Sequence, residues 1–359
     1  MTNNNTIKLF LTNWMIVFYF QNAYSGYGDP QDSLPSAFER EVLVMTNAVR
    51  MAPVAFRNTC IAGTSILSES VYPAVPPLLY NQDLSRAARF HSIDMAKNCG
   101  MAHNSCDGTS FSARISTFYK DSATIAENIA TGKTNGLQTV IQWLRDDIQN
   151  VPAVDGSGND GHRKNIMNAV YKEQGCGYAY NGSRQWYHFW TQDFGAGKVA
   201  MVKVPAGCHF NPDNTTLTFA ANYYEPSGAA PSSAAVIIDN DAKKMDIMLG
   251  TAAKGTWSYS MPDDKKTHCY YFLFTDASEV KIRFPETATL TTGNELSCTA
   301  SSVINGQSVN AQRISYKNRN NPASMYSLNG VQITGKLAIY RYASGILCGK
   351  EGGRISVNK

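Results

Sequence analysis

The sequence predicts an α+β protein, with helices in its first half and an all-β second half. Two observations carry this prediction. Apolar residues recur at spacings of three and four through Phe38, Val42, Met45 and Val49, which gives one apolar helix face. Beyond Phe210, short strand-like runs alternate with Pro, Gly, Asn and Asp. Helices followed by runs of strands are typical of an α+β fold or of separate domains.

The first half shows three helical patterns. Ser36 is the predicted N-cap of the first, and Pro53 ends it because proline disfavours helix at the preceding residue. Asp83 is the predicted cap of a second helix that continues to Met95. A third covers 140–148 around Trp143 and places two carboxylates near a C-terminus, where the helix dipole disfavours them.

An antiparallel hairpin follows these helices. The runs 175–180 and 185–190 are rich in aromatic residues and flank Asn181-Gly182, a strong hairpin signal. The aromatic run from Trp186 to Trp190 is predicted to be sheet core. The pattern favours an α+β unit over a wound parallel sheet.

The strand-like runs of the second half predict an all-β sandwich. They cover 217–224, 235–238, 256–260, 269–274, 279–284, 331–334 and 337–342. A chain of 359 residues exceeds the usual size of a single core. The predicted division is residues 1–25 as a signal peptide, 36–200 as the first domain and 215–345 as the β-sandwich.

The bulk composition describes a globular protein. The hydrophobic share is 43% and the charged share 17%. The net charge of +4 is small, and no Lys/Arg cluster provides the positive stripe that phosphates require. We therefore expect no nucleic-acid partner.

The N-terminus has the layout of a secretory signal. An apolar run from Leu9 to Phe20 follows Lys8, and small residues at Ala23 and Ser25 precede the expected cleavage site. The run is shorter than a membrane-spanning helix needs, so secretion is favoured over a transmembrane anchor. Asn181 and Asn214 lie in glycosylation sequences, which fit a secreted surface.

Eight cysteines in a secreted chain predict disulfides. Cys99 and Cys106 are close enough in sequence to close the loop that carries His103. The other pairings stay open. No Cys-x-x-Cys pair is present, so a thiolate zinc site or a thioredoxin-like motif is not expected.

The residues able to perform chemistry are few. The sequence has no His-Glu-x-x-His, Gly-x-Ser-x-Gly or EF-hand motif. What remains is His103, Glu127 and His162, with Asp146 or Asp147. Imidazoles and carboxylates suit zinc with an open position for water, and the same set suits acid–base catalysis. His91 falls on an apolar helix face and Ser105 in a turn, so both are expected to be structural.

Several motifs in this order resemble the CAP superfamily, which comprises cysteine-rich secretory proteins, antigen 5 and pathogenesis-related 1 proteins. They are His103-Asn-Ser, Ala126-Glu-Asn-Ile-Ala, Trp143, Gly161-His-Arg-x-Asn-Ile-Met and Thr191-Gln-Asp-Phe. The match runs from about Phe38 to Gly195 and is closer to the bacterial and protist SCP-domain branch. It implies an α-β-α sandwich, and the second half similarly resembles the immunoglobulin-like extensions of some such proteins.

The resemblance also implies a cleft lined by a His–Glu–Glu–His tetrad. Its members here would be His103, Glu127, Asp146 and His162, holding Zn²⁺ or another divalent cation. Ala126 replaces the family's glycine, and an aspartate replaces the second glutamate. An insertion at 149–160 lies between that aspartate and His162.

Three functions follow from this resemblance. The favoured one is extracellular binding of a lipid or sterol, a glycan or a protein. The alternatives are a metal-assisted hydrolase, with His103, Glu127 and His162 as its catalytic candidates, and a structural module in which the tetrad only holds the fold. Non-catalytic binding is favoured over enzymatic activity.

Overall fold

The structure is a computed structural model that describes residues 26–293 and Cys298, together with the backbone of four short strands between 325 and 350. The predicted signal peptide, and part of the predicted β-sandwich, lie outside these residues. Within them, no helix is both long and apolar enough to cross a membrane.

Residues 37–195 form a helical and β unit, called here the N-terminal region. Its elements are α1 Ala37–Met51, α2 Pro53–Cys60, β1 Leu79–Tyr80, α3 Gln82–Asp94, the π-helical turn η1 Met95–Cys99, α4 Phe111–Phe118, β2 Ile125–Thr131, α5 Gly136–Arg145, α6 Gly161–Met167, β3 Glu173–Tyr180 and β4 His188–Gly195.

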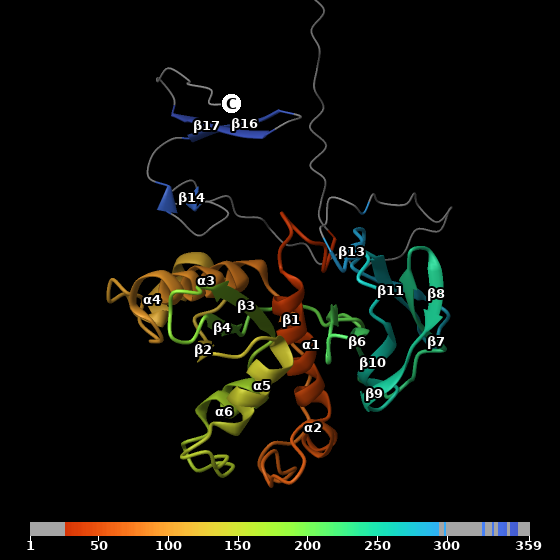
Figure 1. The fold of residues 1–359 in the computed structure, drawn as a ribbon. Coiled ribbons are helices and arrows are strands. Elements are labelled where there is room, and N and C mark those ends of the chain that lie inside the picture. The colour runs from red at the N-terminus through yellow and green to blue at the C-terminus, as the bar shows by residue number, and fades with distance from the viewer. Residues whose placement is uncertain are drawn as a thin grey trace, which may run out of the picture.

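One four-stranded sheet organises the N-terminal region. The strand order is β1-β3-β4-β2, with β1 parallel to β3 and the other pairs antiparallel. Helices α3 and α4 cover one face, and α1, α5 and α6 cover the other (Figure 1). α3 packs closely because β3 presents Gly175 and Gly177, where a Cβ would lie 2.0 Å and 2.2 Å from helix backbone nitrogens. The predicted α+β character and the β3–β4 hairpin are confirmed.

The helix boundaries follow local capping chemistry. Ser36 caps α1 in a capping box with Glu39, as its sequence predicts. The cap of α3 is Asn81 rather than Asp83, because the Asn81 side chain accepts from the backbone N–H groups of Asp83 and Leu84. α5 ends at Arg145 with Asp146 as its C-cap, and the Asp146 carboxylate accepts from backbone N–H groups at the start of α6.

Residues 207–291 form a C-terminal β region. Its strands are β5 Gly207–Phe210, β6 Thr216–Tyr224, β7 Ser233–Ile238, β8 Asp241–Lys244, β9 Asp246–Gly250, β10 Lys254–Pro262, β11 Cys269–Thr275, β12 Lys281–Phe284 and β13 Leu290–Thr291. Further strands are β14 Met325–Tyr326, β15 Gln332–Ile333, β16 Leu337–Tyr342 and β17 Gly345–Lys350.

The strands up to β13 make two sheets. One has the order β5-β6-β10-β9 and the other β12-β11-β7-β8, and in the second sheet β13 also pairs with β11. Side chains of both sheets share one buried cluster that includes Phe219, Tyr223, Phe272 and Phe274. All seven predicted runs contain strands, while β5, β8, β9, β13, β14 and β17 were not predicted. The domain limits of 36–200 and 215–345, and the immunoglobulin-like class, stay predictions.

Helix α1 lies between the N-terminal sheet and the β region. Every residue from Glu39 to Met51 is buried. Its core cluster includes Trp190 and Phe194 of the N-terminal sheet as well as Cys208 and Ala220 of the β region. Asn222 of β6 also donates to the Val44 carbonyl at 3.2 Å. The two regions therefore share a core instead of touching through polar surfaces.

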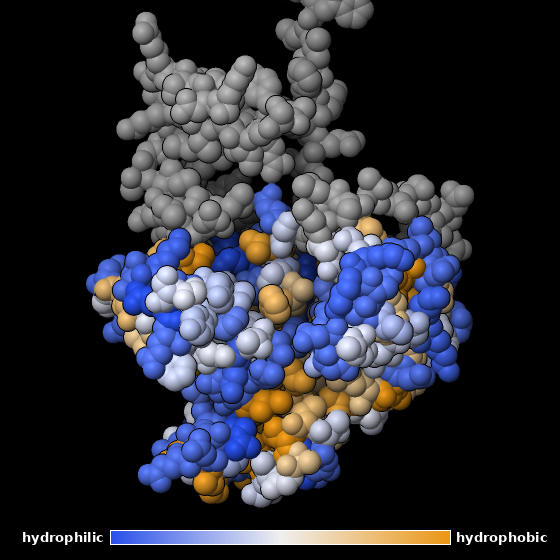
Figure 2. Space-filling model, in the orientation of Figure 1, coloured by the Kyte–Doolittle hydropathy of each residue, from blue (hydrophilic) through white to orange (hydrophobic). Residues whose placement is uncertain are grey.

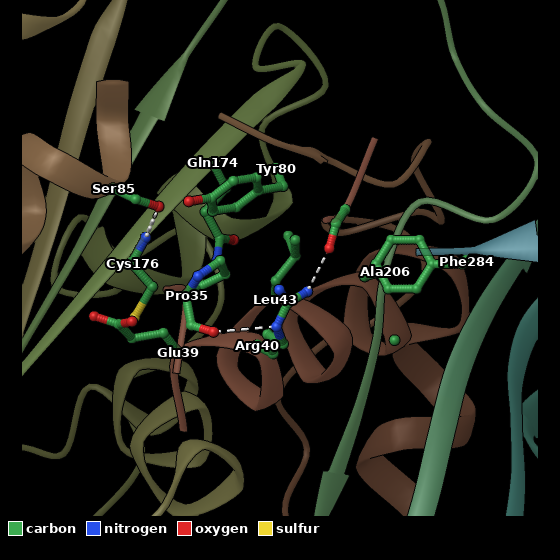
Figure 3. Close-up of a pocket in the computed structure, with 12 residues that line it drawn as sticks. Pro35, Glu39, Arg40, Leu43, Tyr80, Ser85, Gln174, Cys176, Ala206 and Phe284 are labelled. Carbon is green, nitrogen blue, oxygen red and sulfur yellow. Dashed lines mark hydrogen bonds between the residues drawn. The ribbon is translucent and has the colours of Figure 1, made fainter. Parts of the chain in front are cut away.

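A small cavity lies at this junction. Its walls come from the segment before α1, from α1, from β3 and from β5 (Figure 3). Arg40 lies in the wall and donates to the carbonyls of Pro35 and Gly28, each at 3.1 Å.

On the outer surface, Figure 2 shows an apolar band over the area where α5, α2 and β9 come together. Leu137, Ala55 and Met248 from these elements are partly buried against the shared core.

Candidate functional site

The loop that carries His103 is held at both ends. Cys99 and Cys106 form the predicted disulfide, with Cα atoms 5.4 Å apart. The Cys106 N–H donates to Asp94 at 2.8 Å. Ser105 forms the predicted turn, since its N–H and carbonyl bond to Thr109 and Gly108. The loop is therefore fixed to the end of α3, and His103 projects from it with a half-exposed side chain.

A buried carboxylate orients the His103 imidazole. Glu127 on β2 accepts from His103 Nδ1 at 2.9 Å through Oε1. Its Oε2 pairs with the buried guanidinium of Arg114 from α4. Arg114 also donates to the His103 carbonyl at 3.1 Å and to Ser105 Oγ at 2.9 Å. A single arginine thus holds the glutamate and the histidine loop together.

A second carboxyl group lies beside Glu127. Asp193 of β4 is its direct partner across the β2–β4 pair, and both residues are buried. Burial, and then repulsion by Glu127, raise the pKa of Asp193 well above its usual value. The raised pKa favours the neutral form of Asp193, so the pairing of Arg114 with Glu127 is the principal charge contact here.

The second imidazole has its own carboxylate. Asp146 adopts a left-handed conformation after α5, with φ of 46°, and its Oδ1 pairs with His162 Nδ1. Its Oδ2 accepts from the backbone N–H groups of His162 and Arg163 at 3.0 and 3.2 Å. Asp147 instead pairs with Arg145 at 3.0 Å. Between the two candidate aspartates, Asp146 is the one in contact with His162.

Two asparagines bring α6 to the edge of the sheet beside Glu127. Asn165 donates to the Glu127 carbonyl at 3.3 Å, and Asn128 donates to the His162 carbonyl at 3.2 Å. Because β2 is an edge strand, the Asn165 bond also satisfies a backbone carbonyl that no further strand covers. The His103–Glu127 and Asp146–His162 pairs therefore flank the same short stretch of β2.

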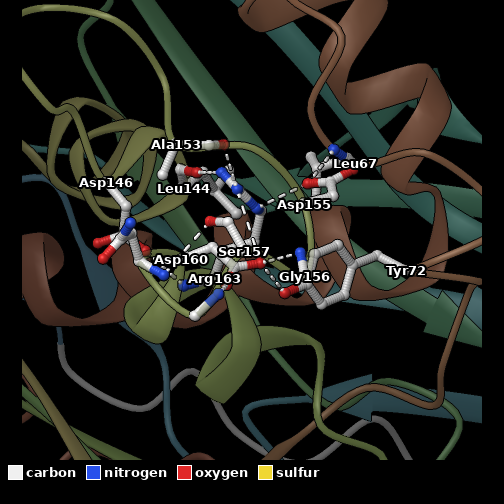
Figure 4. A network of polar contacts seen from close by, with 12 residues as sticks. Leu67, Tyr72, Leu144, Asp146, Ala153, Asp155, Gly156, Ser157, Asp160 and Arg163 are labelled. Atoms are coloured by element: carbon white, nitrogen blue, oxygen red, sulfur yellow. Dashed lines mark hydrogen bonds and ion pairs between the residues drawn. The ribbon is translucent and has the colours of Figure 1, made fainter.

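The insertion at 149–160 is an ordered loop beside this site. Arg163 pairs with Asp155 at 2.9 Å, and Asp160 accepts from Tyr72 and from the Gly156 N–H (Figure 4). Asp155 also accepts from the backbone N–H of Ser68 at 2.8 Å. Arg163 thus provides the countercharge for the aspartates of this loop.

The donor atoms fit a metal at the imidazoles better than at the carboxylates. Both oxygens of Glu127 and of Asp146 are engaged, whereas no hydrogen bond to the Nε2 atom of either His103 or His162 occurs within the described part of the chain. A histidine that binds a metal through Nε2 typically donates Nδ1–H to a carboxylate. Glu127 and Asp146 have the position of such orienting groups, and His103 and His162 would be the ligands.

The structure places no three of the four tetrad residues with ligand atoms within 4.8 Å of one another. The one such group in the described ranges is Asp94, Cys99 and Cys106, whose two sulfurs form the disulfide. The four-ligand metal site therefore stays a prediction.

The remaining sequence assignments have clear outcomes. His91 is fully buried, bonds the Ala102 carbonyl at 2.8 Å through Nε2, and has a pKa lowered to about 4 by burial. It is a core residue, as predicted. Trp190 is buried as predicted, but Trp186 is 53% exposed, so the aromatic run is only partly sheet core. Arg114 was missed, because nothing in the sequence pattern places α4 beside Glu127.

Comparison with known proteins agrees with this geometry. The family model described as "Cysteine-rich secretory protein family" (CAP) matches residues 46–194, which contain both imidazole pairs. Residues 46–194 are a CAP domain. The same segment includes the β2–β4 pairing and α6, so the family match covers the elements that position the site.

Relatives of the CAP domain cover only part of the chain. The YkwD protein of Bacillus subtilis (strain 168) is 28% identical over 159 residues, which is 44% of this chain and 47% of that protein. The chain thus spans about half the length of this curated relative.

Two solved structures are also similar to part of the chain. An extracellular protein containing an SCP domain from Bacillus anthracis str. Ames is 24% identical, with a TM-score of 0.27, over 35% of this chain and 39% of its own. Schistosoma mansoni venom allergen-like protein 4 is 18% identical, with a TM-score of 0.29, over 46% of this chain and 92% of its own.

Proposed function

We propose that this chain is a secreted binding protein whose CAP domain holds a divalent cation at the His103 and His162 imidazoles. The observation that carries the proposal is the pairing of each Nδ1 with a buried carboxylate, which leaves Nε2 open. The carboxylates are themselves fixed, Glu127 by Arg114 and Asp146 by backbone N–H groups of α6. Such support orients ligands before a metal arrives.

The four residues have distinct tasks in this proposal. Glu127 and Asp146 each accept a hydrogen bond from Nδ1–H, which fixes the tautomer and leaves a lone pair on each Nε2. Arg114 pairs with Glu127 and so gives this buried carboxylate its countercharge. Bound zinc would supply a Lewis acid that attracts a carboxylate, carbonyl or phosphate oxygen of a ligand. Lipids or sterols, glycans and protein segments are the ligand classes we consider.

Catalysis is the second candidate, because an imidazole oriented by a carboxylate also suits a general base. The nearest hydroxyl in the loop does not favour it. Ser105 is buried, and its Oγ accepts from Arg114 at 2.9 Å, which holds it in the structural network. We therefore place binding ahead of a hydrolase.

Extracellular location and further details belong to the same proposal. The signal-like N-terminus, the Cys99–Cys106 and Cys269–Cys298 disulfides and the extracellular Bacillus anthracis relative all fit a secreted protein. We further propose that the two C-terminal sheets, which share one core, form an immunoglobulin-like sandwich.

The deciding experiment is zinc titration of untagged, metal-stripped protein by calorimetry, with metal content measured by mass spectrometry. We expect stoichiometric zinc in the wild type and loss of binding in His103→Ala/His162→Ala. His268→Gln is the matched control, because both ring nitrogens of His268 are already occupied, and it should bind zinc normally. Equal zinc binding in all three proteins, or none in any, would refute the metal site.

The same proteins separate binding from hydrolysis. We expect no turnover of a peptide and ester panel by zinc-loaded wild type. Turnover that disappears in Glu127→Gln would favour the hydrolase. A lowered melting temperature in the double alanine variant, with no zinc bound by the wild type, would indicate a purely structural clasp.

A further inference from the structure

The outer end of the β3–β4 hairpin carries large aromatic side chains that the imidazole site does not use. Tyr180 is 62% exposed, Trp186 53% and Tyr187 49%. Burying an aromatic side chain contributes strongly to stability, so three exposed on one hairpin indicate a surface kept for contact with something else.

The rings continue from the core to the surface on one face of the sheet. Tyr178 and Tyr180 alternate along β3, and their partners on β4 are Trp190 and His188. Ring centroids lie 4.5 Å apart for Tyr178–Trp190, 5.2 Å for Tyr180–His188 and 6.5 Å for Tyr180–Tyr187. The last two rings are inclined by only 21°. We call Tyr180, Trp186, Tyr187 and His188 the aromatic platform.

The platform is uncovered because α1 is too short to reach it. Phe38, in the first turn of α1, contacts Tyr178 at 5.3 Å and Trp190 at 6.4 Å between ring centroids. The helix begins at Ala37, so it covers the inner rings only. Burial along β3 declines accordingly from Glu173 to Tyr180.

The platform is also fixed in place. The Asn181 N–H donates to the Tyr187 carbonyl at 2.7 Å, and Tyr178 Oη bonds His188 Nδ1 at 2.8 Å. On the other side of the turn, Arg184 donates to the carbonyls of Ala96 and Lys97 at 3.1 and 2.6 Å. A rigid surface loses little conformational entropy when it binds a partner.

The chemistry of the platform favours an uncharged, hydroxyl-rich partner. Three of its four members are uncharged aromatic residues, and burial lowers the pKa of the fourth, His188, which favours its neutral form. The electron-rich ring faces attract the C–H face of a pyranose, and the tyrosine hydroxyls bond sugar hydroxyls. An anionic membrane or a nucleic acid would instead require cations among the contact residues.

We propose that the aromatic platform of the β3–β4 hairpin is a binding site for an uncharged glycan chain. The site is separate from the imidazole pairs and does not depend on a metal. The near-parallel Tyr180 and Tyr187 rings are the stacking surfaces.

The test uses the full secreted chain with chitohexaose, cellohexaose and soluble mannan as probes, measured by calorimetry and by affinity electrophoresis. We expect at least one probe to bind with a Kd of about 1 mM or below, as is usual for weak, specific contacts. Tyr180→Ala/Tyr187→Ala should weaken this binding by roughly tenfold or more, the loss expected when stacking faces are removed. Tyr180→Phe should retain most of it, because the ring face remains.

Two controls keep the result specific. Tyr224→Ala removes a half-buried tyrosine of the β region and should leave glycan binding unchanged. Zinc removal should leave it unchanged too, which separates this site from the proposed function. The proposal is overturned if no probe binds at millimolar concentration or if the double variant binds as tightly as wild type. The proposal is also overturned if the wild type binds phosphatidylcholine–phosphatidylserine vesicles and not the glycans, and the double variant loses this binding.

Discussion

Histidine–carboxylate contacts occur in both halves of the molecule, but they leave the imidazoles in different states. In the CAP domain, His103 and His162 each meet one carboxylate through Nδ1. In the β region, His268 meets two: Asp239 at 2.6 Å through Nδ1 and Asp264 at 2.9 Å through Nε2. His268 is buried, whereas His103 is half-exposed.

The difference separates an imidazole that completes a fold from one able to bind a ligand. His268 uses both ring nitrogens to join the β7–β8 turn to the loop before β11, so no lone pair remains for a metal. The CAP-domain imidazoles are oriented equally well and keep one nitrogen open. The presence of a carboxylate partner therefore does not distinguish a site, but the number of occupied ring nitrogens does.

The largest effect on stability should come from removing the guanidinium of Arg114, which pairs with Glu127 in the CAP domain. Arg114→Met leaves Glu127 buried without its countercharge, and we expect a loss of about 3–5 kcal/mol in the free energy of unfolding, measured with urea. Lys203→Met is the matched change in the β region. Lys203 pairs with Glu225 and Asp276 at 2.9 and 2.7 Å but is 37% exposed, so its loss should be about 0–1 kcal/mol. Equal losses would remove the distinction between the two regions.

The two disulfides should contribute unequally. Replacing both cysteines by serine at Cys99–Cys106 reopens a loop of sequence separation 7, for which chain entropy predicts a loss of about 2–3 kcal/mol. The Cys269–Cys298 separation of 29 predicts about 3–4 kcal/mol. Urea unfolding measures both. Only the loss of the Cys99–Cys106 disulfide should also weaken zinc binding, because only this disulfide holds the His103 loop. If the loss of either disulfide weakened zinc binding equally, this expectation would be wrong.

Opposite pH dependence should follow from His91 and His268. Burial lowers the pKa of His91 to about 4, so the wild type should lose up to roughly 3 kcal/mol relative to His91→Gln as pH falls from 6.5 to 4. Burial alone would lower the pKa of His268, but its bonds to Asp239 and Asp264 raise it overall. Its stabilising effect should be complete below pH 6.5 and lost as pH rises through the raised pKa. The melting temperature of His268→Gln should therefore approach that of the wild type at high pH.

If the difference in stability between wild type and either variant stayed the same at every pH, the ionisation of that imidazole would not be coupled to folding. For His268→Gln, a growing difference at high pH would have the wrong sign and would contradict the two-carboxylate arrangement.

The smallest effect concerns the two glycosylation sequences. Asn214 is exposed, so we expect it to carry the glycan when the chain passes through a eukaryotic secretory pathway. Asn181 uses its Nδ2, the acceptor atom for sugar, to donate to the Ala96 carbonyl at 2.7 Å. Intact-mass measurement should show a shift that Asn214→Gln abolishes and Asn181→Gln leaves. The reverse pattern would indicate that the hairpin turn is modified before it folds.

Periodicity and capping residues predicted α1, α3, α5 and the β3–β4 hairpin of the CAP domain, whereas the short helices α2, α4 and α6 were not predicted. Ser36 marks the start of α1 within the sequence, and the runs on either side of Asn181-Gly182 predict the β3–β4 hairpin. Strands β8 and β9 escaped prediction because they are short and largely exposed, so no alternation of buried and polar residues identifies them.

The site was predictable by residue type but not by geometry. His103, Glu127 and His162 were recognisable as reactive groups. Arg114 was not, because its role arises from the packing of α4 against β2. Asp264 and His268 are four residues apart, yet they lie in a loop, where this spacing has no predictive meaning.

Helix α1 has a consequence for how this protein can be divided. It is buried on the side of the CAP sheet and also on the side of β5 and β6, so a fragment containing only residues 36–200 would place a row of apolar side chains in water. The CAP domain of this chain should therefore behave as an incomplete folding unit when expressed alone. A successful fragment would need polar replacements on the α1 surface that Cys208 and Ala220 now cover.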